Sequence, residues 1–380
     1  MFENLALTLS SLPGGAFIWS TMIFVFVIGI LVFVHELGHY LAARSVGVHV
    51  ETFSIGFGKE LFGWNDRVGT RWKVSILPLG GYVKMYAMHG EMNKDDVPHD
   101  RHHHAFINKS VLRRMWVVFA GPFANFLFAF AILAGMFYAL GERRPTAEVG
   151  PVVAEMPAAI AGLQEGDRIL SINGIAIQYW DELVPMIREN GGSIMRFAVH
   201  RLADDTMHVI DIQPQEKNMT NMLGETQKVY QIGIQVGKGF ERIDHGVFDS
   251  IKLGAYATYN QTSMILQALW RMITGQMAAD IGGPLTIGKV AGEQATMGFE
   301  SLIFFMAFIS INLGLINLFP VPVLDGGHLV YFMIEGITGR PLSERLQDIA
   351  NRVGMGLLAT LMLFAFYKDI LNVVLPVFQG

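Results

Sequence analysis

The sequence lacks cysteine and carries little charge. With no cysteine among its 380 residues, the chain has no disulfide framework, no thiolate zinc site and no thiol nucleophile. Asp, Glu, Lys and Arg make up 16% of the residues, against about 25% in an average soluble protein. The net charge of −5 gives no basic surface for a nucleic acid, which disfavours a nucleic-acid-binding protein.

Apolar residues are abundant instead. They make up 52% of the chain and include 27 Phe and 21 Met. A soluble protein of this length could not bury so much apolar surface. The composition therefore predicts an integral membrane protein.

Four stretches are long and apolar enough for spanning helices, which need about 20 such residues. They run over Ala16–Ala43, Met115–Leu140, Ser301–Leu324 and about Ile349–Leu371. We therefore expect a polytopic α-helical membrane protein with four transmembrane helices.

A fifth apolar stretch, Leu253–Trp270, contains the polar run from Asn260 to Ser263. Because polar residues interrupt it, we expect an amphipathic helix at the membrane surface rather than a fifth span. It lies within an interfacial region that we place at residues 237–300.

Charge asymmetry predicts the orientation of the spans. Residues 44–114 contain eleven Lys and Arg against seven Asp and Glu, whereas Met1–Ala16 contain no Lys or Arg. By the positive-inside rule, residues 44–114 are cytoplasmic, and both termini and residues 141–300 are extracytoplasmic. Since no basic region precedes the first apolar run and no small-residue cleavage site follows it, we read a span rather than a cleaved signal peptide.

The segment between the second and third spans has the pattern of a soluble domain. Apolar residues alternate as in strands at 151–154, 168–172, 196–199 and 208–212, and Tyr179–Glu189 has helical spacing. The run Pro157–Gly174, with its turn pairs Gly166-Asp167 and Asn173-Gly174, resembles the signature of PDZ domains. The resemblance implies an inserted PDZ domain at 145–236, a fold that binds extended peptides at a sheet edge. A spacer domain without a ligand is the alternative.

Residues 50–88 have a strand pattern. Val50–Phe57, Arg71–Leu77 and Gly81–Met85 read as short strands joined by glycine-rich turns. The residues alone are compatible with a set of hairpins at the membrane surface.

The residues that suggest chemistry form the motif His35-Glu36-Leu37-Gly38-His39. On a helix, residues four apart share one face, so both imidazoles can bind one metal ion while Glu36 acts as a general base. A cluster of ionisable residues at the end of a membrane span is a functional candidate by default. The alternative is a solvated cluster at the cytoplasmic end of the helix.

A catalytic zinc ion takes three protein ligands and keeps one open position, and Asp325 is the best candidate for the third ligand. It follows the third span, where Pro320 and Pro322 break the helix and Gly326 and Gly327 let the chain turn. In the predicted orientation, His35 and Asp325 both lie towards the cytoplasmic side.

The His-Glu-Leu-Gly-His motif, together with Asn-x-x-Pro-x-Pro-x-Leu-Asp-Gly at 317–326, resembles the site-2 protease family of intramembrane zinc metalloproteases, and within it the bacterial regulators of sigma-E proteolysis. Matching runs cover most of the chain, for example Gly121–Asn125 and Ser310–Gly314. The resemblance implies that His35, His39 and Asp325 bind Zn2+, that Glu36 is the catalytic base, and that Asn312 and Asn317 contact substrate. It also implies that the β region re-enters the membrane and pairs with substrate. Relatives with two tandem PDZ domains are well known, whereas this chain has room for one.

These observations predict a zinc metalloendopeptidase of the bacterial inner membrane that cuts transmembrane segments in regulated intramembrane proteolysis. Its membrane core comprises residues 1–140 and 301–380. By resemblance, its partners are single-span substrates, such as anti-sigma factors or remnant signal peptides, and an upstream protease that trims them first. The alternative is a membrane scaffold with a vestigial metal site that recruits partners through its PDZ domain. A transporter lacks support, because we find no inverted repeat.

Overall fold

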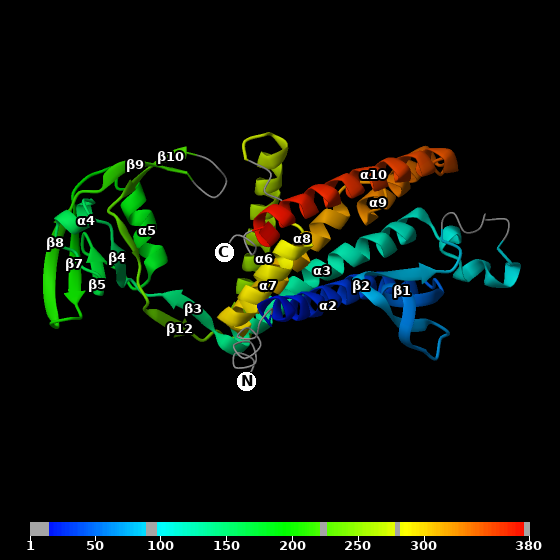
Figure 1. The fold of residues 1–380 in the computed structure, drawn as a ribbon, viewed down its shortest axis with the longest axis horizontal. Coiled ribbons are helices and arrows are strands. Elements are labelled where there is room, and N and C mark those ends of the chain that lie inside the picture. Colours follow the sequence, from blue (N-terminus) through cyan, green and yellow to red (C-terminus); the bar gives the residue numbers. More distant parts are fainter. Residues whose placement is uncertain (1–14, 89–96, 221–225, 278–281, 376–380) are drawn as a thin grey trace. The chain divides into compact units, whose positions relative to one another are not determined.

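The computed structural model describes residues 15–88, 97–220, 226–277 and 282–375 (Figure 1). The chain separates into two compact units. The helical unit comprises Met1–Gly135, Lys252–Ile265 and Ala279–Gly380, and the β-rich unit comprises Met136–Ile251 and Leu266–Ala278. The predicted extracytoplasmic leader lies largely outside the described residues.

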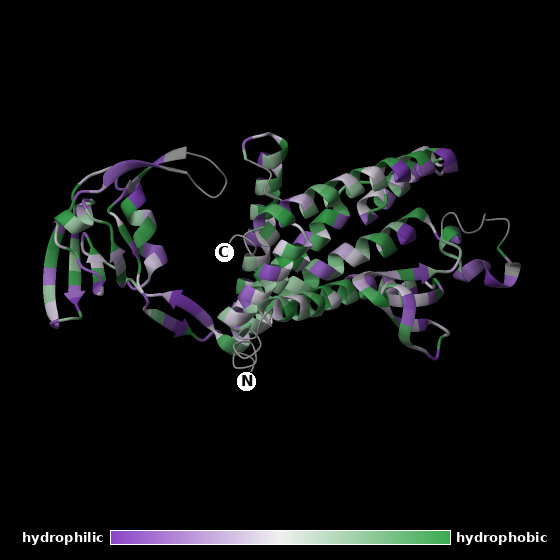
Figure 2. Cartoon of the chain, viewed as in Figure 1, coloured by the Kyte–Doolittle hydropathy of each residue, from purple (hydrophilic) through white to green (hydrophobic). Residues whose placement is uncertain are grey.

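Six helices are rich in apolar residues (Figure 2). They are α2 (Gly15–Ser45), α3 (Val111–Leu140), α6 (Val247–Ile273), α8 (Phe299–Leu318), α9 (Asp325–Thr338) and α10 (Glu344–Asp369). The other helical segments are η2 (His99–His104), η3 (Phe106–Asn108), α4 (Pro157–Ile160), α5 (Trp180–Glu189), α7 (Pro284–Met297) and η4 (Ile370–Val374).

Four helices of the described chain are long and apolar enough to cross a membrane: α2, α3, α8, and α10 extended to Asn372. The prediction of four spans is thus confirmed at this level. Helix α8, the third predicted span, ends at Leu318 rather than at the predicted Leu324, because Pro320 and Pro322 cannot continue it. Helix α6 is not among the four, and its Tyr256, Tyr259 and Trp270 are exposed, as expected of an interfacial helix.

Small residues bring α7 close to α2. Gly288, Ala291, Gly292 and Ala295 are the buried face of α7. A Cβ added at Gly292 would lie 2.2 Å from the Oγ of Ser20, so only glycine fits there. Close approach of backbones through small residues is typical of helix packing in membranes.

The β region is a long hairpin of β1 (Val50–Asn65) and β2 (Arg71–Met85). Residues 53–55 of β1 pair with two segments of β2, with 72–74 on one side and with 81–83 on the other. Phe53, Val83 and Met85 are buried in a cluster with residues of α2 and α3. Strand β1 is longer than the predicted Val50–Phe57, since Gly56 and Gly58 adopt positive φ values and let the strand bulge and continue.

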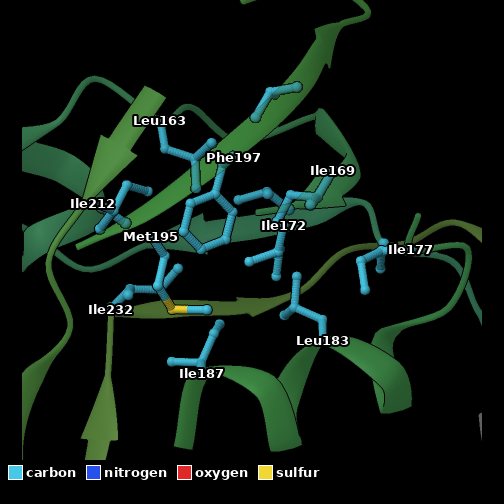
Figure 3. Close-up of a cluster of buried hydrophobic side chains, with 14 residues drawn as sticks. Leu163, Ile169, Ile172, Ile177, Leu183, Ile187, Met195, Phe197, Ile212 and Ile232 are labelled. Atoms are coloured by element: carbon cyan, nitrogen blue, oxygen red, sulfur yellow. The ribbon is translucent and has the colours of Figure 1, made fainter. Parts of the chain in front are cut away.

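The β-rich unit has a four-stranded antiparallel sheet in the order β6-β5-β7-β8. Its strands are β5 (Asp167–Ile172), β6 (Ile175–Ala176), β7 (Met195–Arg201) and β8 (Thr206–Ile212). Three two-stranded pairs complete the unit: β3 (Glu142–Pro145) with β12 (Phe240–Ile243), β4 (Val149–Val152) with β11 (Ile234–Val236), and β9 (Gln215–Thr220) with β10 (Thr226–Gln231). The core lies between this sheet and α5, where Ile169, Phe197 and Leu183 are fully buried (Figure 3). The predicted strands and helix are therefore present.

A buried ion pair ties β5 to β7. Asp167 is 1% exposed and accepts bonds of 2.9 Å from both Nε and Nη2 of Arg201. Burial alone would raise the pKa of Asp167, but hydrogen bonds from Arg201 and from the Gln164 N–H outweigh it and hold the pKa below its ordinary value. A carboxyl with a lowered folded-state pKa stabilises the fold above the pKa of the unfolded chain.

We expect Asp167→Asn to lower the free energy of unfolding of the β-rich unit by about 1.5–3 kcal/mol at pH 7, the range for hydrogen bonds to charged groups. The stabilisation is fully present above about pH 4, the pKa of an unfolded Asp. It should disappear as the pH falls through the lowered folded-state pKa. Hydrogen-exchange protection of β5 and β7 in the full-length protein, compared at pH 7 and pH 3, measures this. Equal protection in the variant and the native chain at pH 7 would contradict it.

Candidate metal centre

Helix α2 presents the motif residues on its buried face. His35, Glu36 and His39 are 8%, 9% and 8% exposed, which is low for three ionisable side chains. The two imidazole rings lie one helical turn apart, with centroids 4.8 Å apart and planes nearly perpendicular. The spacing of four residues thus places both rings on one side of the helix, as predicted.

Asp325 is the first residue of α9, after an irregular segment that begins at Phe319. A Cβ at Gly326 would lie 2.2 Å from the carbonyl oxygen of Phe319, and one at Gly327 would lie 2.5 Å from that of Val321. The two glycines therefore allow α9 to start directly against the segment that precedes it. Val323 has a φ of 86°, a strained value for a β-branched residue, and such strain gathers at functional sites.

Three side-chain atoms from these two helices converge. The Nε2 atoms of His35 and His39 are 3.2 Å apart, and the Oδ2 of Asp325 lies 3.2 Å from the first and 3.4 Å from the second. This is the one group of three potential metal ligands found among the described residues. The structure therefore brings together the three residues that the sequence suggested. Asp325 in α9 lies 286 positions or more after the two histidines of α2.

The spacing of the three atoms fits a tetrahedral metal ion. Bonds of about 2.0–2.1 Å in a tetrahedron place neighbouring ligand atoms about 3.3 Å apart, which matches the three distances. In addition, Asp325 Oδ2 is buried and has no hydrogen-bond donor among the described residues. A cation between the three atoms would satisfy the carboxylate and both imidazole lone pairs.

The other nitrogen of each imidazole is held by α3. Nδ1 of His39 lies 2.9 Å from the carbonyl oxygen of Val117, which accepts only, so Nδ1 carries the proton and Nε2 keeps its lone pair. A Cβ at Gly121 would lie 2.2 Å from Nε2 of His39, so glycine at this position makes room for the ring. Partners of this kind orient metal-binding imidazoles.

Asn125 has the same relation to His35. It is fully buried, and its side-chain amide lies 3.1 Å from Nδ1 of His35. As placed, the nitrogen Nδ2 faces the ring and Oδ1 has no partner within the described structure. A half-turn of the amide exchanges the two atoms, and the oxygen then accepts the Nδ1–H. A metal-bound His35 requires this orientation, because Nε2 must keep its lone pair.

Sequence reasoning gave no role to Val117 or Asn125. The available signal was their spacing, since residues 117, 121 and 125 repeat every four positions on one face of α3. The hydroxyl of Ser310 in α8 donates to the backbone oxygen of Asn125 at 2.8 Å. This bond connects a third helix to the support of the site.

Glu36 lies next to β2. A Cβ at Gly81 would lie 2.9 Å from Cγ of Glu36, so the strand can pass the catalytic candidate only at a glycine. Within the described residues, Gly81–Met85 pair with β1 alone, and this part of the strand has one unpaired edge. Backbone hydrogen-bonding groups are therefore available in the neighbourhood of Glu36.

The two residues that were predicted to contact substrate both lie on α8, and neither has a hydrogen bond to the three converging atoms in the described structure. Asn312 is half-buried, and its amide donates to the Phe308 carbonyl of its own helix at 2.9 Å. Asn317 is also half-buried, one residue before the helix ends. Their assignment to substrate stays a prediction.

Comparisons with known proteins also indicate a metalloprotease. The chain matches the model of peptidase family M50 over residues 23–361. A provisionally named zinc metalloprotease of Agrobacterium fabrum is 35% identical over 84% of this chain and 87% of that protein. One of Rhizobium meliloti is 36% identical over 83% and 87%. The regulator of sigma E protease of Haemophilus influenzae is 30% identical over 94% of this chain and 100% of its own length.

The last alignment runs over 447 positions, whereas this chain has 380 residues. The Haemophilus protein therefore contains residues that have no counterpart here. His35, Glu36, His39 and Asp325 all lie within the part of the chain that the family model matches.

We expect Asn125→Leu to weaken zinc binding about 10- to 100-fold, the usual effect of removing a partner of a metal-binding histidine. Asn125→Asp keeps an acceptor oxygen towards His35 and should bind zinc more tightly than the Leu variant. Competition with a chelator on the purified protein measures both. Ser310→Ala is the matched control, because the Ser310 hydroxyl donates to the backbone oxygen of Asn125 and not to its side chain. A folded Leu variant with native zinc affinity would show that Asn125 does not orient His35.

Proposed function

Because this chain belongs to peptidase family M50, the site-2 protease family, we propose that it is an intramembrane zinc protease. It hydrolyses peptide bonds within the transmembrane segments of single-span proteins. The observation that carries this proposal is the tetrahedral spacing of the His35, His39 and Asp325 donor atoms. One of the two helices that supply them, α2, is long and apolar enough to cross a membrane.

The residues present fit a zinc ion, and each has a distinct task. His35, His39 and Asp325 hold the metal, which when bound supplies Lewis acidity to a carbonyl group and to water. Glu36 accepts a proton from the attacking water while the water oxygen bonds to the scissile carbonyl carbon. Glu36 then gives the proton to the leaving amine as the C–N bond breaks. Buried surroundings exclude competing water from Glu36.

A transmembrane substrate reaches this site only after local unwinding, because a helix engages its own carbonyl groups in hydrogen bonds. We assign the unpaired edge of Gly81–Met85 to this step. An extended segment of substrate adds to the edge as a further strand, as in other sheet-edge complexes. The close approach of Gly81 to Glu36 supports this assignment, with Asn312 and Asn317 contacting the same segment. Hairpins that merely rest on the membrane surface remain the alternative for β1 and β2.

The β-rich unit is proposed to be a PDZ domain on the extracytoplasmic side. A groove of about 300 Å³ runs between α5 and residues 229–236. Trp180, Val184 and Ile187 line it from the helix side. A groove between a helix and a strand is where a PDZ domain takes an extended peptide. The unit either binds the substrate there or acts as a size filter that blocks untrimmed substrates.

We propose the remaining assignments on the resemblance to the family and, for the orientation, on the charge asymmetry of the sequence. The protein is placed in the bacterial inner membrane, with both termini outside. Its substrates are anti-sigma factors or remnant signal peptides, already shortened by an upstream protease. The scaffold alternative needs a metal site that has lost its function, and the full set of converging donor atoms counts against that.

Substitutions can distinguish the role of Glu36 as a base from the role of Asp325 as a metal ligand. Glu36→Gln should retain about one zinc ion per chain yet lose cleavage, because the carboxylate is needed as a base and not as a ligand. Asp325→Asn should bind zinc much more weakly and lose cleavage, because one of the three proposed ligands is removed. Metal analysis of the purified variants, together with cleavage of a single-span substrate, measures the two effects. The scaffold alternative requires that Glu36→Gln restore signalling in a deletion strain, and that result would exclude the protease.

Another prediction concerns the β-rich unit. Thr146 N–H donates to the Gly239 carbonyl at 3.0 Å, so residues 147–238 can be replaced by a two-residue Asn-Gly turn that joins β3 to β12 as a hairpin. A size filter predicts that this deletion leaves cleavage of a trimmed substrate intact and allows premature cleavage of a full-length one.

A groove-blocking variant, Val184→Arg, provides the matched control. A filter should be insensitive to it, since the bulk of the domain is unchanged. A peptide-binding domain predicts instead that both the deletion and Val184→Arg reduce cleavage of the trimmed substrate. Such a reduction in a folded variant would reject the filter.

A further inference from the structure

A fully buried arginine lies at the start of α3. Arg114 is 2% exposed and is among the largest fully buried side chains of the described chain. Its Nη2 donates to Oε1 of Glu335 at 2.6 Å, and Glu335 is 9% exposed. Burying two charges costs desolvation free energy that the pair only partly recovers. The Arg114–Glu335 pair therefore adds little net stability, and its presence needs another explanation.

The remaining contacts of Arg114 hold its guanidinium in one orientation. Nε donates to the Lys109 carbonyl at 3.1 Å, and the guanidinium carbon lies 4.8 Å from the ring centre of Phe332. Nη1 is buried without a hydrogen-bond partner within the described structure. Arg114 thus contacts two residues of α9, Phe332 and Glu335, which are three apart and share one face of the helix.

Helix α9 connects this contact to the metal centre. It begins at Asp325, ten residues before Glu335, which is about 15 Å of helix. Its buried residues are Gly326, Gly327, Phe332 and Glu335. The helix is consequently held at its first turn by the glycine contacts and near its end by Arg114.

Helix α3 supports all three proposed ligands. Val117 and Asn125 hold the rings of His39 and His35, and Arg114, one turn before Val117, holds α9. A shift of α9 along α3 would move Asp325 away from the two imidazoles. Apolar contacts tolerate such a shift, whereas the buried Arg114–Glu335 pair does not, because each charge would lose the counter-charge that it has among the described residues.

We infer that Arg114 and Glu335 are positioning residues that set the register of α9 on α3 and so place Asp325 opposite His35 and His39. This inference rests on the proposed function, since it concerns the same metal site. Fixing register is the best-attested role of buried polar and ionic pairs.

The test measures zinc affinity of the full-length purified protein by competition with a chelator. Glu335→Ala should weaken zinc binding about 10- to 100-fold, towards the value of Asp325→Asn. In an Asp325→Asn background, the same Glu335→Ala change should alter zinc affinity less than about twofold, because the residue that it positions is no longer a ligand. Equal weakening in both backgrounds would overturn the inference, since it would indicate a general structural role.

A second variant covers the case in which Glu335→Ala does not fold. Arg114→Met combined with Glu335→Met removes both charges and keeps a similar side-chain volume, a change that buried ion pairs often tolerate. We expect this variant to fold and to bind zinc at least tenfold more weakly. Native zinc affinity in the folded double variant would overturn the inference.

The Arg201–Asp167 pair is the matched control, because it is also a buried Arg–carboxylate pair but belongs to the β-rich unit. Of this pair only Asp167 is fully buried, while Arg201 is half-buried. Asp167→Asn should leave zinc affinity unchanged. The proposed ligand set and the positioning role are contradicted by different results. If Asp325→Asn itself binds zinc normally, the proposed ligand set is wrong. If Asp325→Asn weakens zinc binding but the Glu335 variants do not, only the positioning role is wrong.

Discussion

Two imidazole lone pairs and a carboxylate oxygen face one another across about 3.3 Å in a buried place, and the rest of the helical unit is arranged around this constraint. His35 and His39 cannot both donate through Nε2, because the Val117 carbonyl holds a proton on Nδ1 of His39, and Asn125, after a half-turn of its amide, does so on His35. Without a cation, three electron-rich atoms would stand together away from water, which is costly. The arrangement is thus understandable as a preorganised metal site. Its organisation lies in the second layer of contacts as much as in the ligands themselves.

Close helix packing makes this second layer possible. A Cβ at Gly38 would lie 2.3 Å from the carbonyl oxygen of Ala120, and one at Gly121 would overlap the ring of His39. The backbones of α2 and α3 therefore approach until a main-chain carbonyl can serve as the partner of an imidazole. In a membrane, where apolar side chains gain nothing by leaving lipid for one another, small residues of this kind allow helices to associate tightly. The same glycines that pack the helices also align the ligands.

Much of this could be predicted from the sequence, because the relevant signals are local. Apolar length marked the four spans, a spacing of four placed His35 and His39 on one face, and Pro320 with the glycines after Asp325 marked the break that lets this residue turn inward. The supports of the site could not be predicted in the same way. Val117 acts through its backbone oxygen, which leaves no trace in the sequence. Arg114 looked like one more basic residue of a cytoplasmic loop, since its counter-charge lies in a helix far along the chain. Likewise, β1 continues past Phe57 only because two glycines adopt backbone angles that a strand pattern does not reveal.

The irregular segment between α8 and α9 links the metal site to its reaction. Hydrolysis consumes water, and a site among apolar helices must admit it. Non-helical backbone at membrane depth is tolerated only where protein covers it or water reaches it. Residues 319–324 satisfy part of their hydrogen bonding locally, as when Leu324 N–H donates to the Val321 carbonyl at 3.1 Å, and Val323 bears a strained φ. Strain of this kind persists only where the surrounding contacts impose it. Here those contacts are made by the two glycines at the start of α9 and by Arg114 of α3, which binds Glu335 near the other end of α9. The break before α9 and the placement of Asp325 therefore depend on the same helix.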